Sequence, residues 1–159
     1  MKKLKLVIDT NIFIRGIFLQ KTYFHCVTLL ELLENENIEL VFSQDTIGEL
    51  LYVIKNFAKH TSYSYDEQLE TLYNVSKIFY DSNSVNTVET VAPKCSDMFD
   101  DMFLKCYIQG NADYIITDDF KSEMDKISNI KVLESKKFII KVLKGNFKDF
   151  GVEIINKRT

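Results

Sequence analysis

Leu4-Lys5-Leu6-Val7-Ile8, followed at once by Asp9-Thr10-Asn11, is the stretch of this sequence that decides its fold. The first five residues are mostly apolar and partly β-branched, a pattern that predicts a buried strand. A second run of this kind, Tyr114-Ile115-Ile116-Thr117, ends two residues before Asp119. In open α/β sheets, functional sites form beyond the carboxyl ends of the parallel strands. We therefore expect acidic residues from distant parts of the chain to meet at one edge of a parallel sheet.

The sequence between and around these two runs predicts further strands and helices in alternation. Apolar residues at helical spacing predict helices over about 12–36 (with a continuation or restart after 21), 47–57, 65–80, 97–109 and 135–143. Short apolar runs predict strands over 39–43, 85–88 and 131–133. This order predicts an α/β fold, a three-layer α/β/α sandwich around a central, mainly parallel sheet. We assign 1–145 to this domain and 146–159 to a C-terminal extension, which forms either an edge strand over 151–155 or a tail.

Length and cysteine content bound the class of protein. A chain of 159 residues fits one domain with a proper core. The three cysteines are odd in number, widely spaced and without a zinc-binding spacing, so we interpret them as reduced packing residues. Met1-Lys2-Lys3 leads straight into a strand pattern, with no long apolar segment after it. We therefore expect no signal peptide, no membrane span and a cytoplasmic location.

The charge of the chain is unevenly distributed. Its net charge is −3, but residues 131–159 carry +5, so residues 1–130 carry −8. An acidic body with a basic C-terminal segment can hold a metal ion in one place and bind phosphates nearby. A solvated, lysine-rich helix face explains the same segment equally well. The charge pattern alone does not choose between these two interpretations.

Five acidic residues lie at the edges of apolar stretches: Asp9, Glu49, Asp100, Asp101 and Asp119. Carboxylates brought together repel one another unless cations lie between them, so their convergence suggests a divalent metal. Hard divalent ions bind carboxylates and support phosphodiester hydrolysis, because they activate water and neutralise negative charge. Three simpler roles stay open: Asp9 as a helix N-cap, Glu49 as a solvated residue and Asp119 as a turn or cap residue.

Asp100 and Asp101 compete for one position in this site. The predicted core face of their helix consists of Phe99, Met102, Phe103 and Cys106. At 100° per residue, Asp100 flanks this face whereas Asp101 points nearly away from it. We therefore prefer Asp100 as the ligand and keep Asp101 as the alternative.

Four blocks of the sequence, taken in order, resemble a PIN domain. They are residues 7–14 around Asp9-Thr10-Asn11, Ser43 with Glu49 six residues later, residues 97–104 around Asp100-Asp101, and residues 111–119 with Thr117 and Asp119. One block alone is a weak signal, whereas four in the right order and spacing over residues 4–140 are a strong one. The chain is similar to the long form of the domain that is found as the toxin of toxin–antitoxin pairs.

This resemblance implies a function and a set of residues. It implies Mg2+ or Mn2+ as cofactor, hydrolysis of RNA phosphodiesters, an antitoxin protein as partner and a homodimer. It places the metal ligands, which are also the catalytic residues, at Asp9, Glu49, Asp100 and Asp119. Supporting residues match at Asn11, Ser43 and Thr117. Asp118 departs from the pattern, which usually has a small or basic residue at that position.

The remaining polar residues give weaker signals. Arg15, Lys136 and Lys137 are the best candidates for contacts with RNA phosphates. His25 and His60 lie outside every block, and we interpret both as surface or packing residues.

Two other functions compete with the nuclease. The first is a PIN-fold module with weak catalysis that binds RNA or a protein. The presence of all four acidic residues argues against it. The second is a phosphotransfer domain of the receiver or haloacid-dehalogenase type, which also has an Asp after its first strand. Asn11 stands where its second Asp is expected, so we set this interpretation aside.

Overall fold

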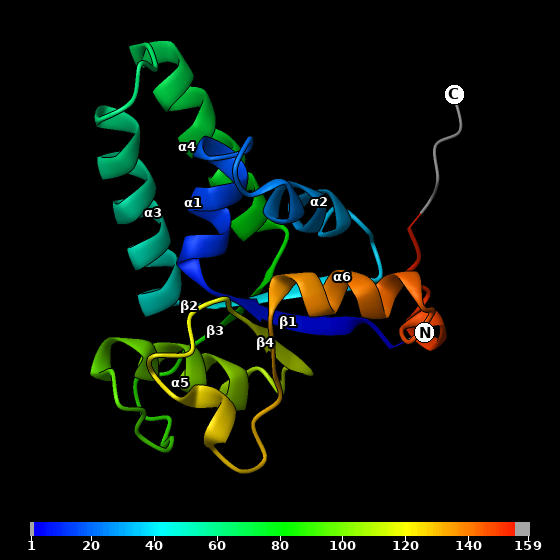
Figure 1. Cartoon of the computed structure of the whole chain (residues 1–159). Helices are drawn as coiled ribbons and strands as arrows, with labels where there is room; N and C mark the ends of the chain where they lie inside the picture. Colours follow the sequence, from blue (N-terminus) through cyan, green and yellow to red (C-terminus); the bar gives the residue numbers. More distant parts are fainter. Residues whose placement is uncertain (1, 155–159) are drawn as a thin grey trace.

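The computed structural model of the chain, which describes residues 2–154, is built around one parallel sheet (Figure 1). Over that range the sheet has five strands in the order β3-β2-β1-β4-β5. The strands are β1 (Leu4–Ile8), β2 (Ile38–Ser43), β3 (Asn83–Val85), β4 (Tyr114–Ile116) and β5 (Val132–Leu133). All four strand pairs are parallel. The predicted parallel sheet is therefore confirmed.

Helices cover both faces of this sheet. They are α1 (Thr10–Phe18), α2 (Phe24–Leu32), α3 (Gln44–Lys59), α4 (Tyr65–Tyr80), α5 (Asp101–Gln109) and α6 (Ser135–Leu143). In Figure 1, α5 lies on one side of the sheet, and α1, α2 and α6 lie on the other. The predicted α/β/α sandwich is thus confirmed. Between residues 2 and 154, no helix has the length and apolar character that crossing a membrane requires.

The buried side chains follow from the alternation of residues along each strand. Leu4, Leu6 and Ile8 of β1 pack in the core with α1, α2, α3 and α6. Val7, between them in sequence, packs on the opposite face with Ile115 and with Phe103 of α5. Successive side chains of a strand point to opposite faces, so a strand covered on both sides must be apolar throughout.

The sequence also explains where two long helices begin. The Ser43 hydroxyl accepts from the backbone N–H of Thr46, and the Thr46 hydroxyl accepts from that of Ser43, so the pair closes a capping box at the start of α3. Ser64 and Glu67 form the same arrangement at the start of α4. Such caps satisfy backbone donors that lack partners in the first turn of a helix. Ser43, at the carboxyl end of β2, thereby fixes the direction in which α3 leaves the sheet.

Several predicted boundaries differ from the structure. The region expected to be helical over 12–36 restarts after residue 21, as one of the two alternatives had it, but its second helix, α2, ends already at Leu32. The short strand expected at 85–88 is β3, which ends at Val85. The helix expected from 97 begins with a 3-10 turn, Met98–Asp100, before α5. This tighter turn has about three residues per turn. Phe99 is consequently 77% exposed, so its assignment to the core face was wrong.

The segment after α6 packs against the domain. Residues 151–154 form no strand, so the edge strand considered over 151–155 is not formed in its described part, and residue 155 lies outside the described residues. A 3-10 turn, Lys148–Phe150, is formed instead. Phe147 and Val152 are buried in the same cluster as β1 and α6. Residues 147–152 therefore contribute to the core of the domain.

The topology brings three strand ends together. β1 lies between β2 and β4, and the backbone N–H of Asp9 bonds to the carbonyl of Ile116 at 2.9 Å. Asp9, Ser43 and Thr117 thus follow three adjacent parallel strands at the same edge. This is the edge at which open α/β sheets carry their sites.

Candidate metal-binding active site

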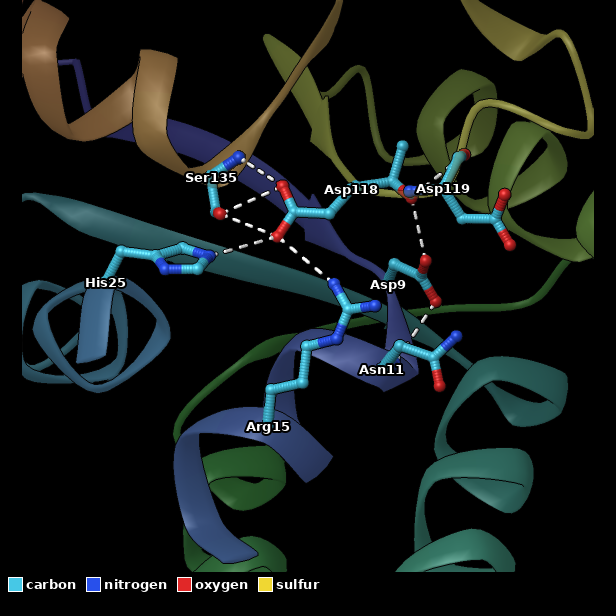
Figure 2. A network of polar contacts seen from close by, with 8 residues as sticks. Asp9, Asn11, Arg15, His25, Asp118, Asp119 and Ser135 are labelled. Carbon is cyan, nitrogen blue, oxygen red and sulfur yellow. Dashed lines mark hydrogen bonds and ion pairs between the residues drawn. The ribbon is translucent and has the colours of Figure 1, made fainter. Parts of the chain in front are cut away.

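Asp9 occupies the centre of this edge and is held on both of its carboxylate oxygens. The Thr117 hydroxyl donates to Oδ2 at 2.7 Å, and the Asn11 backbone N–H donates to Oδ1 at 3.3 Å (Figure 2). Asp9 is also the N-cap of α1, so the simpler role left open for it is real. Burial raises its pKa, and the hydrogen bond from Thr117 opposes this effect. One side chain therefore both starts a helix and presents an oriented, buried carboxylate.

Glu49 enters the site from the second turn of α3. Its atom Oε2 is buried and has no hydrogen-bond partner among the described residues. Burial, and after it repulsion from Asp9 and Asp100, together raise the pKa of this carboxyl to about 7. A solvated glutamate would show neither property, so Glu49 faces the other acids. A buried oxygen without a partner is costly in a folded protein.

Asp100 and Asp101 diverge although they are adjacent. Burial, and after it repulsion from Asp9 and Asp119, raise the pKa of Asp100 to about 6. Asp101 instead accepts hydrogen bonds from the backbone N–H of Cys95 at 2.8 Å and from its thiol at 3.0 Å. The structure therefore directs Asp100 towards the other carboxylates and Asp101 towards the loop around Cys95.

Asp119 and Thr117 complete the group. The Thr117 hydroxyl accepts from the backbone N–H of Asp119 at 3.1 Å while it donates to Asp9. Asp119 Oδ1 accepts from the backbone N–H of Lys121 at 2.9 Å, so its turn-stabilising role is also real. Its repulsion contributes to the raised pKa values of Asp9 and Asp100. The buried Thr117 hydroxyl thus links the backbone of Asp119, just after β4, to the carboxylate of Asp9, just after β1.

Two of the supporting residues, Asn11 and Ser43, hold other parts of the site in place. Asn11 reaches Asp9 through its backbone N–H. Ser43 is buried, and its hydroxyl caps α3. Ser43 therefore contributes by aiming the helix that carries Glu49.

The four carboxylates of Asp9, Glu49, Asp100 and Asp119 are chemically suited to a hard divalent cation. They come from four separate segments, and three of them have pKa values raised by burial together with mutual repulsion. The unpartnered Oε2 of Glu49 adds a lone pair that nothing in the described chain satisfies. Oxygen ligands at high negative charge density are what Mg2+ and Mn2+ require. The donor set therefore fits the cofactor that the sequence indicated.

A second polar cluster, next to the first, was missed by the sequence reasoning. Asp118 accepts from the backbone N–H of Ser135 at 2.8 Å and from its hydroxyl at 2.7 Å. The Arg15 guanidinium and His25 Nε2 each lie 3.5 Å from Asp118 Oδ2 (Figure 2). His25 had been interpreted as a surface or packing residue, and Asp118 had been given no role. No spacing in the sequence signals that α1, α2, β4 and α6 bring these four residues together.

His25, Cys26 and Asp118 of this cluster lie close enough to be considered as metal ligands. One ligand atom from each lies within 4.8 Å of the others. However, burial and the nearby Asp118 raise the pKa of the Cys26 thiol to about 11. Asp118 is already engaged by Arg15 and Ser135. A protonated thiol and an occupied carboxylate favour a hydrogen-bonded network over a second metal site.

The residues expected to contact RNA lie on two neighbouring helices. Arg15 of α1 stacks on the ring of Tyr23, with its guanidinium carbon 4.6 Å from the ring centre. Lys136 and Lys137 are exposed in the first turn of α6, and Lys137 lies 3.6 Å from Glu134. Arg15 is thus held by Asp118 and Tyr23 within the second polar cluster, whereas Lys136 and Lys137 are exposed.

A cavity elsewhere on the described part of the chain does not contain these acids. It measures about 790 Å³ and lies between α2 and α4, with a lining of mixed apolar and acidic residues. None of the four carboxylates lines it. The acidic site therefore lies apart from this cavity.

Comparison with known proteins identifies the family. The family model described as PIN domain matches residues 5–121, so the chain belongs to the PIN domain family. This family consists typically of metal-dependent ribonucleases. The structure is similar to the crystal structure of PAE2754 from Pyrobaculum aerophilum, with 10% sequence identity, 87% of this chain and 88% of that chain covered, and a TM-score of 0.49. No curated protein matches the sequence.

Proposed function

We propose that this chain is an endoribonuclease that hydrolyses RNA phosphodiesters with Mg2+ or Mn2+. The observation that carries the proposal is the convergence of Asp9, Glu49 and Asp100 with mutually raised pKa values, together with the buried, unpartnered Oε2 of Glu49. Such a group is unfavourable unless a cation is bound to it. Asp119 supplies the fourth carboxylate.

The chain's own residues would hold this site rigid. Thr117 and the Asn11 backbone fix both oxygens of Asp9, and Ser43 caps the helix that carries Glu49. A divalent ion, when bound, would activate water and neutralise charge on the scissile phosphate. Arg15 and Lys136 would bind flanking phosphates. The hydroxyls of Ser43 and Thr117 are buried and hydrogen-bonded, so we expect water to be the nucleophile and no covalent intermediate with the protein.

Biological role and assembly are further proposals, and they rest on the sequence resemblance. We infer that the enzyme is the toxin of a toxin–antitoxin pair, acts in the cytoplasm, forms a homodimer and binds an antitoxin protein. A short open reading frame directly beside this gene would support that role. Sedimentation of the purified chain would test the dimer.

The deciding experiment is RNA cleavage with purified protein. Wild type should cleave single-stranded RNA in Mn2+ or Mg2+ and lose this activity when EDTA is added. Asp9→Asn should be inactive, because it nearly preserves shape but removes the charge that binds the cation. Asp125→Asn, an identical change at an exposed position, is the matched control. A folded wild type that binds RNA without cutting it would favour the binding module instead.

A further inference from the structure

Asp118 and Asp119 are neighbours in sequence but point into different surroundings. Figure 2 shows Asp118 directed towards Ser135, His25 and Arg15, whereas Asp119 lies on the side of Asp9. Asp118 is largely buried, with 15% of its side chain exposed, and its two oxygens receive the hydrogen bonds of Ser135. Ser135 is the first residue of α6. Asp118 is therefore a fixed carboxylate anchored to the end of a helix.

Two side chains from other helices approach this carboxylate. Arg15 NH1 and His25 Nε2 approach the same oxygen, Oδ2, from α1 and α2. Both side chains are part-exposed, at 29% and 21%. Arg15 is also held from its other side by the ring of Tyr23. A guanidinium stacked on a ring and bonded at one nitrogen keeps a preorganised edge for an anion.

The position of Arg15 relates this pair to the acidic site. Arg15 follows Asn11 by four residues on α1, so the two side chains lie on the same face of that helix. The Arg15 charge is close enough to Asp9 to oppose the rise in the pKa of Asp9. Lys136, in the first turn of α6, is close enough to Cys26 to lower the pKa of its thiol. Positive groups thus line the side of the acidic site that the second cluster occupies.

We propose that Arg15 and His25 form a binding subsite for an RNA phosphate that flanks the scissile one, and that Asp118 is its positioning residue. The proposal rests on the proposed ribonuclease function and deepens it. Asp118 does not touch the RNA; it holds two donors in one orientation, and Ser135 holds Asp118. A second phosphate contact at a fixed distance from the acidic site would place the chain of the substrate across the carboxylates.

The sign of one substitution separates this role from simple electrostatics. A carboxylate near a polyanion repels it, so removal of Asp118 by Asp118→Asn should tighten RNA binding if the charge acts alone. If Asp118 positions Arg15 and His25, the same substitution should weaken binding even though a negative charge has gone. The structure therefore predicts a rise in KM for Asp118→Asn, with kcat changed less.

The experiment measures kcat and KM for cleavage of a short, labelled single-stranded RNA in Mn2+, using the full chain. Arg15→Ala should raise KM by about tenfold, in line with loss of one charge-assisted contact. Asp118→Asn should raise KM by about threefold to tenfold. The double variant should fall short of the product of the two single effects, because part of the effect of Asp118 acts through Arg15. Asp125→Asn, in the 3-10 turn Met124–Lys126 of the same connection, should leave KM unchanged.

His25→Gln keeps the proposal testable if Asp118→Asn disturbs the docking of α6. It leaves the Asp118–Ser135 bonds in place and should raise KM by about twofold to fivefold. The subsite would be overturned by a lower KM for Asp118→Asn, or by a double variant whose KM rises by the full product of the Asp118→Asn and Arg15→Ala effects. It would also be overturned if KM were unchanged in both Arg15→Ala and His25→Gln. Those results require an active wild type. A wild type that cuts no RNA would overturn the ribonuclease and, with it, the subsite.

Discussion

Glu49→Gln should make the metal-free protein more stable, although it removes a residue of the proposed active site. The charged form of Glu49 is disfavoured in the folded chain by burial and by repulsion from Asp9 and Asp100. Glutamine has nearly the same shape and carries no charge. It can also donate a hydrogen bond to a neighbouring carboxylate. The substitution therefore relieves an unfavourable state that the unfolded chain does not share.

The size of this effect follows from the pKa of Glu49, which rises from 4.5 to about 7. At about 1.4 kcal/mol for each unit by which a pKa changes, a change of this size corresponds to roughly 3 kcal/mol in the free energy of unfolding. Glu49 is only half-buried, and solvent screening reduces the figure to roughly 1–1.5 kcal/mol. For a chain of this length each kcal/mol changes the melting temperature by about 2–4 °C, so the variant should melt higher by roughly 2–6 °C.

The effect should depend on pH in one direction. Between about 4.5 and about 7 the folded chain keeps a proton on Glu49 that the unfolded chain has lost. The free energy of unfolding of wild type therefore falls as pH rises through that window. The glutamine variant lacks this loss. Its advantage should be small near pH 5 and nearly complete at about pH 8.

Thermal unfolding in EDTA, followed by circular dichroism at both pH values, measures this difference. Glu70→Gln, at an exposed position on α4, is the matched control and should change the free energy of unfolding by less than about 0.5 kcal/mol. The reasoning would be refuted if Glu49→Gln melted no higher than wild type at the higher pH. It would also be refuted if the difference in melting temperature were the same at both pH values. Glu49 would then not face a cluster of carboxylates.

Four further outcomes are expected. Asp9→Asn should fold, abolish Mn2+-dependent cleavage and melt higher than wild type in EDTA; activity within a fewfold of wild type in nuclease-free preparations would contradict the ligand assignment. Asp100→Asn should lose at least ~100-fold in cleavage rate while Asp101→Asn stays active, and the reverse ranking would exchange their roles. Mn2+ at ~100 times its dissociation constant should stabilise wild type by about 2.7 kcal/mol, seen as a melting temperature higher by roughly 5–11 °C, and Mg2+ should do less; no response to either ion would count against the site. Phe147→Ala should cost about 3–5 kcal/mol in denaturant unfolding, because the ring is buried against Phe138, and a loss below about 1 kcal/mol would show that the segment after α6 is dispensable.

The fold could be predicted from the sequence because each strand of the sheet centre carries its own signal. β1 and β4 are short apolar runs, and helical spacing fills the chain between them. Parallel strands with helical connections have few stable arrangements, so the sandwich follows. The boundaries that failed depend on local geometry instead. The 3-10 turn at Met98–Asp100 changes the phase of the following helix, and no residue type in that stretch marks the change.

The acidic site could be anticipated because strand ends and block spacing mark it. The second cluster could not. Asp118 meets His25 only because α2 and α6 pack side by side, and it meets Ser135 only because α6 begins where β5 ends. These are consequences of packing between elements, which a linear spacing does not record. Ser43 shows the intermediate case, since the block spacing marks its position whereas the role of its hydroxyl, which caps a helix, is visible only in the structure.

The insertion of β1 between β2 and β4 also has a consequence for a chain that is still being made. Asp9 is synthesised among the first residues, yet the Thr117 hydroxyl that fixes it comes 108 residues later. At roughly 5–20 residues per second, the ribosome adds that partner roughly 5–20 s after Asp9. An incomplete chain that already holds β1 and β2 lacks at least one of the four carboxylates, Asp119, until residue 119 has emerged and β4 has paired with β1. Under the proposed ribonuclease function, a nascent copy of this protein would therefore be unable to cut the message from which it is being translated.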